Sequence, residues 1–177
     1  MLKNKEIKII TLTREPISRN VSGFFQNLED FISKKKSEKK ELIDMFFKKE
    51  DNYYTISWFD RELSSIFGID IYKGKFCKDR GYQIIEKGNI KTFVTRIENL
   101  NRISKQLGEF LEIENFILEN VNEGSDKWYS SMYNELKTEI EFPADYIEKR
   151  YISKYMKHFY TDEEINKFKN KWLRKEQ

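Results

Sequence analysis

The feature that most constrains the fold is a short apolar run near the start of the chain, residues 7–12 (IKIITL). The run is rich in β-branched residues and almost continuous in apolar character, which is typical of a strand buried on both faces, as in a parallel sheet. It ends at Thr13 and Arg14, and Pro16 then fixes a turn. Apolar residues return at helical spacing over residues 18–33. The sequence therefore predicts a strand of a parallel sheet that leads directly into a helix.

The remaining chain predicts a small sheet with many helices. A glycine in Lys87-Gly88-Asn89 is a tight-turn signal between two strands. The other expected elements are a helix over 57–68 that ends at Gly68, the two strands within 82–97, a helix up to residue 111, a short strand and loop within 114–124, and helices to the C-terminus with a capping box at Thr161 and Glu164. We expect an α/β fold with a small, mostly parallel sheet and heavy helical cover.

Composition limits the classes of protein that this chain can represent. Its 177 residues suffice for one domain, which we expect to cover residues 1–177, and a 15% aromatic content provides a core although 36% of the residues are charged. A net charge of only +3 argues against binding nucleic acid by bulk electrostatics. No signal peptide and no apolar run of membrane-spanning length is visible, so a cytoplasmic location is expected. The single cysteine, Cys77, and the single histidine, His158, are expected to pack, and no metal site is predicted.

Groups that favour anions gather where the first strand meets the first helix. Ligands of open α/β sheets bind beyond the carboxyl ends of the strands, and Arg14 stands at such an end. The N-terminus of a helix offers unpaired N–H groups, the arginine adds a planar donor fork, and the hydroxyls of Ser18 and Ser22 lie within reach. The stretch therefore predicts a phosphate site. In the alternative interpretation, Ser18 is an ordinary N-cap and Arg14 pairs with Glu15 or with a surface carboxylate.

These residues resemble a known family. Arg14, Pro16 and Ser22 are similar to the segment of sulfotransferases that binds the 3′-phosphate of the sulfate donor, phosphoadenosine phosphosulfate. Three later stretches extend the likeness to bacterial capsular polysaccharide synthesis proteins with a Lys-Trp-Tyr-Ser motif. They are FVTRIENL (93–100), SDKWYSSMYNELK (125–137) and SKYMKHFYTDEEINKFKNKW (153–172). The resemblance covers most of the chain and implies the C-terminal portion of a sulfotransferase-like P-loop fold, with a carbohydrate as the sulfate acceptor.

The resemblance also implies a loop that closes over the donor. Gly124 and Lys127 match this loop loosely, and Lys127 is the fourth candidate for donor binding, although it could equally be a surface charge. Trp128 and Tyr129 follow it, and we expect them to pack in the core and against a helix.

One half of a sulfotransferase site has no counterpart in this sequence. The family holds the 5′-phosphosulfate with a glycine-rich loop and a lysine, and it places a general base upstream of the arginine segment. Only 13 residues precede Arg14, and they contain no glycine-rich loop. The chain is therefore expected to be inactive alone, as the C-terminal portion of a longer enzyme, a truncated gene product or half of a split protein. Without a neighbouring strand, residues 7–12 should form an exposed edge that favours self-association.

Two other functions remain open. The chain could be a non-enzymatic helical interaction module, or a defective remnant, that binds no nucleotide. A weaker alternative is a fragment of a glycosyltransferase, which would need a divalent metal held by paired aspartates at a strand end, and no such pair is evident.

Overall fold

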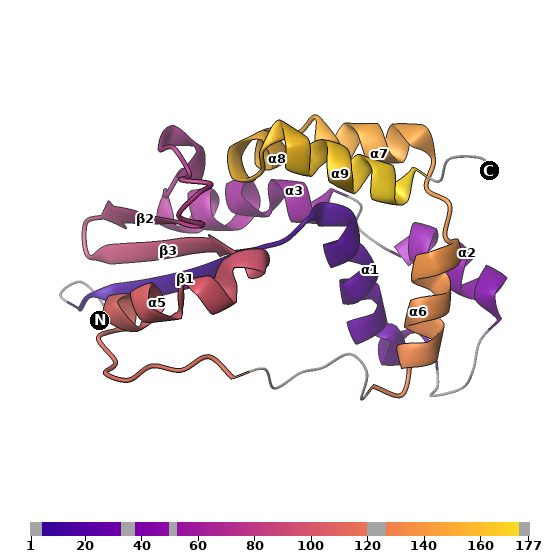
Figure 1. The fold of residues 1–177 in the computed structure, drawn as a ribbon, viewed down its shortest axis with the longest axis horizontal. Helices are drawn as coiled ribbons and strands as arrows, with labels where there is room; N and C mark the ends of the chain where they lie inside the picture. Colours follow the sequence, from indigo (N-terminus) through magenta and orange to yellow (C-terminus); the bar gives the residue numbers. More distant parts are fainter. Residues whose placement is uncertain (1–4, 33–37, 50–52, 120–126, 174–177) are drawn as a thin grey trace.

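The computed structural model describes residues 5–32, 38–49, 53–119 and 127–173, with a small sheet at one end of the molecule and helices around and beyond it (Figure 1). These ranges contain three strands, nine α-helices and one π-helical segment. The elements are β1 (Ile7–Thr13), α1 (Pro16–Gln26), α2 (Lys39–Lys49), α3 (Tyr54–Trp58), the π-helical segment Phe59–Ser64, α4 (Ser65–Phe67), β2 (Tyr82–Lys87), β3 (Ile90–Arg96), α5 (Ser104–Leu111), α6 (Ser130–Glu139), α7 (Ala144–Tyr151), α8 (Lys154–Phe159) and α9 (Asp162–Trp172). Short 3-10 helices cover Leu28–Asp30, Ile71–Lys73 and Ile97–Arg102.

The sheet is mixed, with the strand order β1-β3-β2. β1 pairs in parallel with β3, from Ile7 opposite Ile90 to Thr13 opposite Arg96, whereas β2 pairs antiparallel with β3. The α/β class is confirmed, but only one of the two strand pairs is parallel, so the sheet is not mostly parallel. The reason is the tight turn at Gly88, whose φ of 59° suits glycine, because strands joined by so short a turn must run antiparallel.

β1 lies at an edge of the sheet, as predicted for residues 7–12. Within the described chain it pairs with β3 alone. Two of its apolar side chains are open to solvent, Ile10 with 41% and Leu12 with 50% exposure, so the expectation that this strand is buried on both faces is wrong. The exposed edge is therefore present, and the self-association that it would favour stays a prediction.

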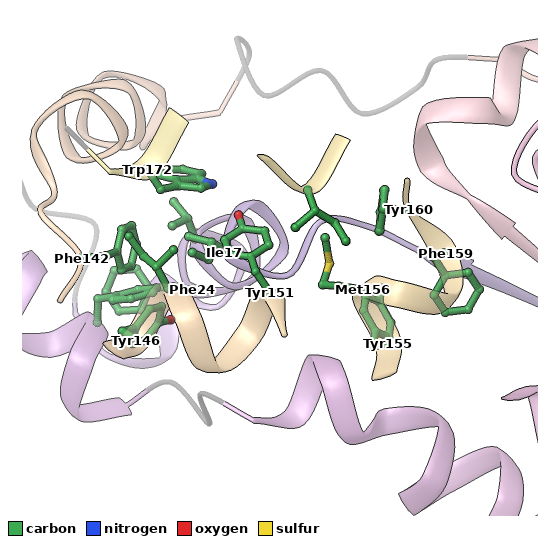
Figure 2. Close-up of a cluster of buried hydrophobic side chains, with 14 of the residues drawn as sticks. Ile17, Phe24, Phe142, Tyr146, Tyr151, Tyr155, Met156, Phe159, Tyr160 and Trp172 are labelled. Carbon is green, nitrogen blue, oxygen red and sulfur yellow. The ribbon is translucent and has the colours of Figure 1, made fainter. Parts of the chain in front are cut away.

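The two faces of the sheet face different cores, because neighbouring residues of a strand point to opposite sides. Phe93 of β3 belongs to a small cluster under α5, with Ile103, Leu107 and Phe110. The next residue, Val94, belongs to the main core, which the helices build. Figure 2 shows Ile17 and Phe24 of α1 among side chains of α7, α8 and α9, together with Phe142 before α7 and Tyr160 before α9. This core fixes α1, and with it the end of β1, against the C-terminal third of the chain.

Local sequence signals set several helix ends. Gly68 ends α4 in the left-handed conformation, with a φ of 62°, as predicted. The capping box of Thr161 and Glu164 at the start of α9 is also confirmed. The first helix, however, begins at Pro16 rather than near residue 18, because the side chain of Glu15 caps it.

The short strand expected within 114–124 is not formed over residues 114–119. Glu112 and Asn115 have φ values of 59° and 54° there, and this left-handed backbone interrupts an extended strand. Residues 120–124 of that prediction lie outside the described residues.

The described helices are short. The longest of them, α1, α2 and α9, have 11 residues each, whereas an α-helix needs about 20 to cross the hydrocarbon core of a bilayer. Within the described ranges, no helix combines the length and the apolar character that a membrane span requires.

Candidate functional site

A buried carboxylate organises the junction between β1 and α1. Glu15 is 1% exposed, and its two oxygens accept hydrogen bonds from the backbone N–H groups of Ile17 and Ser18, both at 2.8 Å. They also accept from the hydroxyl of Tyr151 at 2.6 Å and from the indole N–H of Trp172 at 3.2 Å. Burial and the neighbouring carboxylate raise the pKa of Tyr151, so this hydroxyl keeps its proton. Glu15 thus ties the junction to the ends of α7 and α9.

This arrangement corrects one part of the predicted phosphate site. The N-terminus of α1 was expected to offer unpaired N–H groups to an anion. Glu15 already accepts from two of those groups and places a negative charge there. Any phosphate near this junction must therefore be bound by side chains, and the helix N-terminus itself is occupied.

The backbone of Arg14 is hydrogen-bonded, whereas its guanidinium forms no ion pair with a carboxylate of the described chain. Its N–H donates to the hydroxyl oxygen of Tyr155 at 3.1 Å, and that hydroxyl donates to the carbonyl of Arg14 at 2.9 Å. Burial raises the pKa of Tyr155, which keeps this clamp protonated. Within the described chain no carboxylate forms an ion pair with the Arg14 guanidinium, and Glu15 is engaged elsewhere. The alternative in which Arg14 pairs with Glu15 is therefore wrong.

Three of the four predicted donor-binding residues line one pocket of about 780 Å³, which we call the Lys127 pocket. Arg14 comes from the end of β1, Ser22 from α1, and Lys127 from the segment that precedes α6. The remaining lining residues are Phe25, Gln26, Glu29, Ile97, Trp128, Tyr129 and Tyr133. The pocket therefore combines two cationic groups, a hydroxyl, a carboxylate and an aromatic wall from distant parts of the chain.

The aromatic wall of the Lys127 pocket has one accessible indole. Trp128 is 37% exposed, and its indole N–H donates to the carboxylate of Glu29 at 2.8 Å. The expectation that Trp128 packs in the core is wrong, because its ring lies at the surface of this pocket. Tyr129 is half-buried, and its ring lies 5.6 Å from that of Phe25, so it does pack against a helix, as expected.

Ser18 does not line the Lys127 pocket. Its hydroxyl oxygen accepts a hydrogen bond from the ammonium of Lys171 at 3.2 Å, and its backbone N–H donates to Glu15. Ser18 is also not the N-cap of α1, because Glu15 holds that position. Its predicted role in donor binding therefore gains no support from the geometry.

A second hollow lies beside Arg14 and was not foreseen from the sequence. This Arg19 pocket has a volume of about 260 Å³. It is lined by Thr11, Leu12, Arg14, Arg19, Tyr54, Thr55, Trp58, Phe59 and Tyr155. The available signal was the spacing of two arginines, five residues apart, across the strand-to-helix turn. Two further hollows, along β2 and along α5, contain none of the predicted site residues.

One carboxylate stands close to the charge of Arg14. Glu98 follows β3, and the hydroxyl of Tyr160 donates to it at 3.4 Å. Although the residue as a whole is exposed, its carboxylate loses hydration against the protein, and this burial raises its pKa. The charges of Arg96 and Arg14 and the backbone N–H of Glu15 oppose that shift. Glu98 is therefore a titratable neighbour of the site.

The single histidine and cysteine lie away from these pockets. His158 packs 5.2 Å from the ring of Tyr72, and its Nε2 lies 3.3 Å from an oxygen of Gln83. Burial, with a contribution from Lys78, lowers the pKa of His158, which favours the neutral ring. Cys77 is half-buried. Among the described residues, no group of three or more histidines, cysteines or carboxylates could hold a metal ion.

Comparison with protein families identifies the chain. Residues 30–161 match a family designated NKWYS and described as "Putative capsular polysaccharide synthesis protein". The chain belongs to this family. The matched region contains Lys127, Trp128, Tyr129 and Ser130, which reproduce the last four letters of the designation, and three of these four line the Lys127 pocket.

The comparisons also limit what the family assignment shows about the Arg14 segment and about activity. The match begins after the Arg14 segment. No curated protein and no solved structure matches the chain, so the likeness to sulfotransferases has no structural counterpart.

Proposed function

We propose that this chain is a sulfotransferase-like protein of capsular or surface polysaccharide synthesis, which binds the 3′-phosphate of phosphoadenosine phosphosulfate in the Lys127 pocket. The observation that carries the proposal is the convergence of Arg14, Ser22 and Lys127 on one pocket. The strand-to-helix turn predicted Arg14 and Ser22 as phosphate-binding residues, and the resemblance to sulfotransferases added Lys127 as a donor-binding candidate.

The chemistry of these groups suits a phosphate monoester. A guanidinium offers two parallel N–H donors to phosphate oxygens, an ammonium adds a point charge, and a hydroxyl donates one further hydrogen bond. Because Glu15 occupies the N-terminus of α1, these side chains provide the binding energy in place of the helix end.

The size and the walls of the pocket suit a nucleotide. A volume of about 780 Å³ lies within the range of about 300–1,000 Å³ that is typical of small-molecule sites. The accessible indole of Trp128 provides a flat apolar surface on which a base can stack, a contact worth about 1–3 kcal/mol in other proteins. The phosphate would then lie toward Arg14 and Ser22.

The proposal concerns binding of the donor, and transfer of the sulfuryl group needs more. The transition state requires groups that position the 5′-phosphosulfate and stabilise its charge. The described residues that line the Lys127 pocket include no glycine-rich loop. We therefore propose that the chain is inactive alone and requires a segment that supplies this loop.

A non-enzymatic interaction module is the second candidate function. It is favoured by the open edge of β1, with the exposed side chains of Ile10 and Leu12, which another protein could cover. The defective-remnant alternative predicts the same edge and no ligand. Neither alternative requires Arg14, Ser22 and Lys127 to meet.

The two functions separate in a calorimetric titration with two nucleotides. Adenosine 3′,5′-bisphosphate carries the phosphate at issue, and adenosine 5′-monophosphate lacks it. We expect the bisphosphate to bind at least about tenfold more tightly, because a hydrogen-bonded charged group typically adds about 1.5–3 kcal/mol. Equal affinities, or no binding of either nucleotide to the folded protein, would exclude the proposal and favour the interaction module.

Helix α1 provides a matched pair of variants. Ser22 lines the Lys127 pocket, whereas Ser18, one turn earlier, is bonded to Lys171. Ser22→Ala should weaken binding of the bisphosphate about tenfold, while Ser18→Ala should leave it within about twofold of the wild type. A stronger effect of Ser18→Ala would show that the phosphate lies outside the Lys127 pocket.

A further inference from the structure

The Arg19 pocket differs from the Lys127 pocket in size and charge. Its volume of about 260 Å³ falls just below the range of sites for drug-sized ligands, so it suits a single ring better than a nucleotide. It lies between the second half of β1, the first turns of α1 and helix α3. Arg14 lines both pockets, so the two hollows adjoin at this side chain.

The charged groups of the Arg19 pocket are both arginines. Arg14 and Arg19 line it, and no aspartate or glutamate does. Neither arginine forms an ion pair with a carboxylate of the described chain. The guanidinium of Arg19 lies over Gly23, at a place where any larger residue would put its Cβ against it. Two guanidinium forks in a lining whose described residues include no carboxylate favour an anionic ligand.

The remaining lining of this pocket is aromatic and hydroxylated. Four rings contribute, from Tyr54, Trp58, Phe59 and Tyr155, and the rings of Trp58 and Phe59 meet edge to face at 5.1 Å. The hydroxyl of Thr55 donates to the amide oxygen of Asn20 at 2.6 Å, so its oxygen can still accept a hydrogen bond. A bare phosphate or sulfate gains little from aromatic walls, whereas a sugar ring presents both an apolar face and hydroxyls.

We propose that the Arg19 pocket binds an acidic monosaccharide unit, a pyranose with a carboxylate such as a uronic acid residue. The arginines would bind the carboxylate, the aromatic rings would contact the apolar face of the sugar, and the threonines would hydrogen-bond its hydroxyls. Membership of a capsular polysaccharide synthesis family makes a saccharide the expected partner. Only the role of this unit as sulfate acceptor rests on the proposed function, whose donor would lie on the other side of Arg14.

The test uses two sugars that differ only in the charged group. Methyl β-D-glucuronide and methyl β-D-glucoside are titrated into the full chain and followed by NMR. The glucuronide should bind, and the glucoside should bind at least about tenfold more weakly, because it lacks the carboxylate that the arginines recognise. Equal binding of the two sugars, or no binding of the glucuronide, would overturn the proposal. Inorganic phosphate that competes with higher affinity than the glucuronide would also overturn it, since the pocket would then be a simple anion site.

Variants locate the binding and separate it from the donor site. Arg19→Gln and Trp58→Ala should each weaken binding of the glucuronide about tenfold. Arg102→Gln removes the same charge from an exposed position outside both pockets and should have no effect. Arg19→Gln should leave the affinity for adenosine 3′,5′-bisphosphate unchanged, because Arg19 does not line the Lys127 pocket. A wild-type chain that binds the glucuronide but not the bisphosphate would contradict only the proposed function. A wild-type chain that binds the bisphosphate but not the glucuronide would contradict only this inference.

Discussion

Two arginines at the carboxyl ends of neighbouring strands differ in the hydrogen-bond partners of their side chains. Arg96 ends β3 opposite Thr13, and Arg14 is the next residue after Thr13 on the neighbouring strand. Arg96 is 5% exposed, and its Nε donates to Asn99 at 2.6 Å while its Nη1 donates to Glu164 at 2.7 Å. It also donates to the carbonyls of Phe159 and Lys78, at 3.3 and 3.4 Å, and lies over the ring of Tyr160. Arg14 lines two pockets, and its side chain has no such set of acceptors among the described residues.

The difference shows how one residue type serves two purposes at the end of a parallel strand pair. The donors of Arg96 are used to join β3 to the start of α9, so this side chain stabilises the fold. In the proposed function the guanidinium of Arg14 binds a ligand, while its backbone is hydrogen-bonded to Tyr155. A position at the carboxyl end of a strand is therefore a weak predictor of function, and the partners of the side chain decide.

The largest expected effect tests the structural half of this comparison. Arg96→Met should lower the free energy of unfolding by about 3 kcal/mol, because it removes a buried charge from its hydrogen-bonded partners and leaves two carbonyls unsatisfied. Arg14→Met should cost less than about 1 kcal/mol, as expected for a half-buried side chain without protein partners. Urea denaturation of both variants provides the measurement. Equal losses of stability would mean that Arg14 also has a structural role.

A smaller effect, on pH dependence, sharpens the functional half. Burial raises the pKa of Glu98, which lies close to the charge of Arg14. Above that raised pKa the carboxylate is charged and repels a phosphate bound at Arg14, and as the pH falls through it the repulsion disappears. Glu98→Gln should therefore bind adenosine 3′,5′-bisphosphate roughly threefold more tightly than the wild type at pH 8, and the difference should vanish near pH 4.

The ratio of the two affinities is the quantity to measure, because it cancels the titration of the phosphate itself. A ratio that stays constant between pH 4 and pH 8 would show that Glu98 does not act on the bound anion.

Local patterns in the sequence predicted the parts of the fold that local physics controls. β1, the hairpin turn at Gly88, the end of α4 and the capping box of α9 all depend on residues within a few positions of one another. The candidates Arg14 and Ser22 were accessible in the same way, since they share one strand-to-helix turn. The resemblance to a family added Lys127, which local patterns alone would not have joined to them.

Contacts between distant segments explain what the sequence could not show. The sequence suggested that Glu15 pairs with the neighbouring Arg14. The side chains that donate to Glu15 in the structure, Tyr151 and Trp172, lie far along the chain and could not be predicted from local patterns. The large apolar ring of Trp128 predicted a core residue. The ring lies instead at the surface of the Lys127 pocket, where its indole N–H donates to Glu29. The sequence did not predict the Arg19 pocket because its lining comes from three separate parts of the chain.

The central claim is that the side chain of Arg14, which forms no ion pair with a carboxylate of the described chain, binds the 3′-phosphate of a nucleotide. The most direct test is a calorimetric titration of adenosine 3′,5′-bisphosphate into the wild type and into Arg14→Ala, with folding of both confirmed by circular dichroism. The account predicts binding to the wild type and a loss of roughly ten- to hundredfold in affinity for the variant, as expected for a bidentate arginine–phosphate contact. Equal affinity in the two proteins, or no binding to the folded wild type, would contradict it.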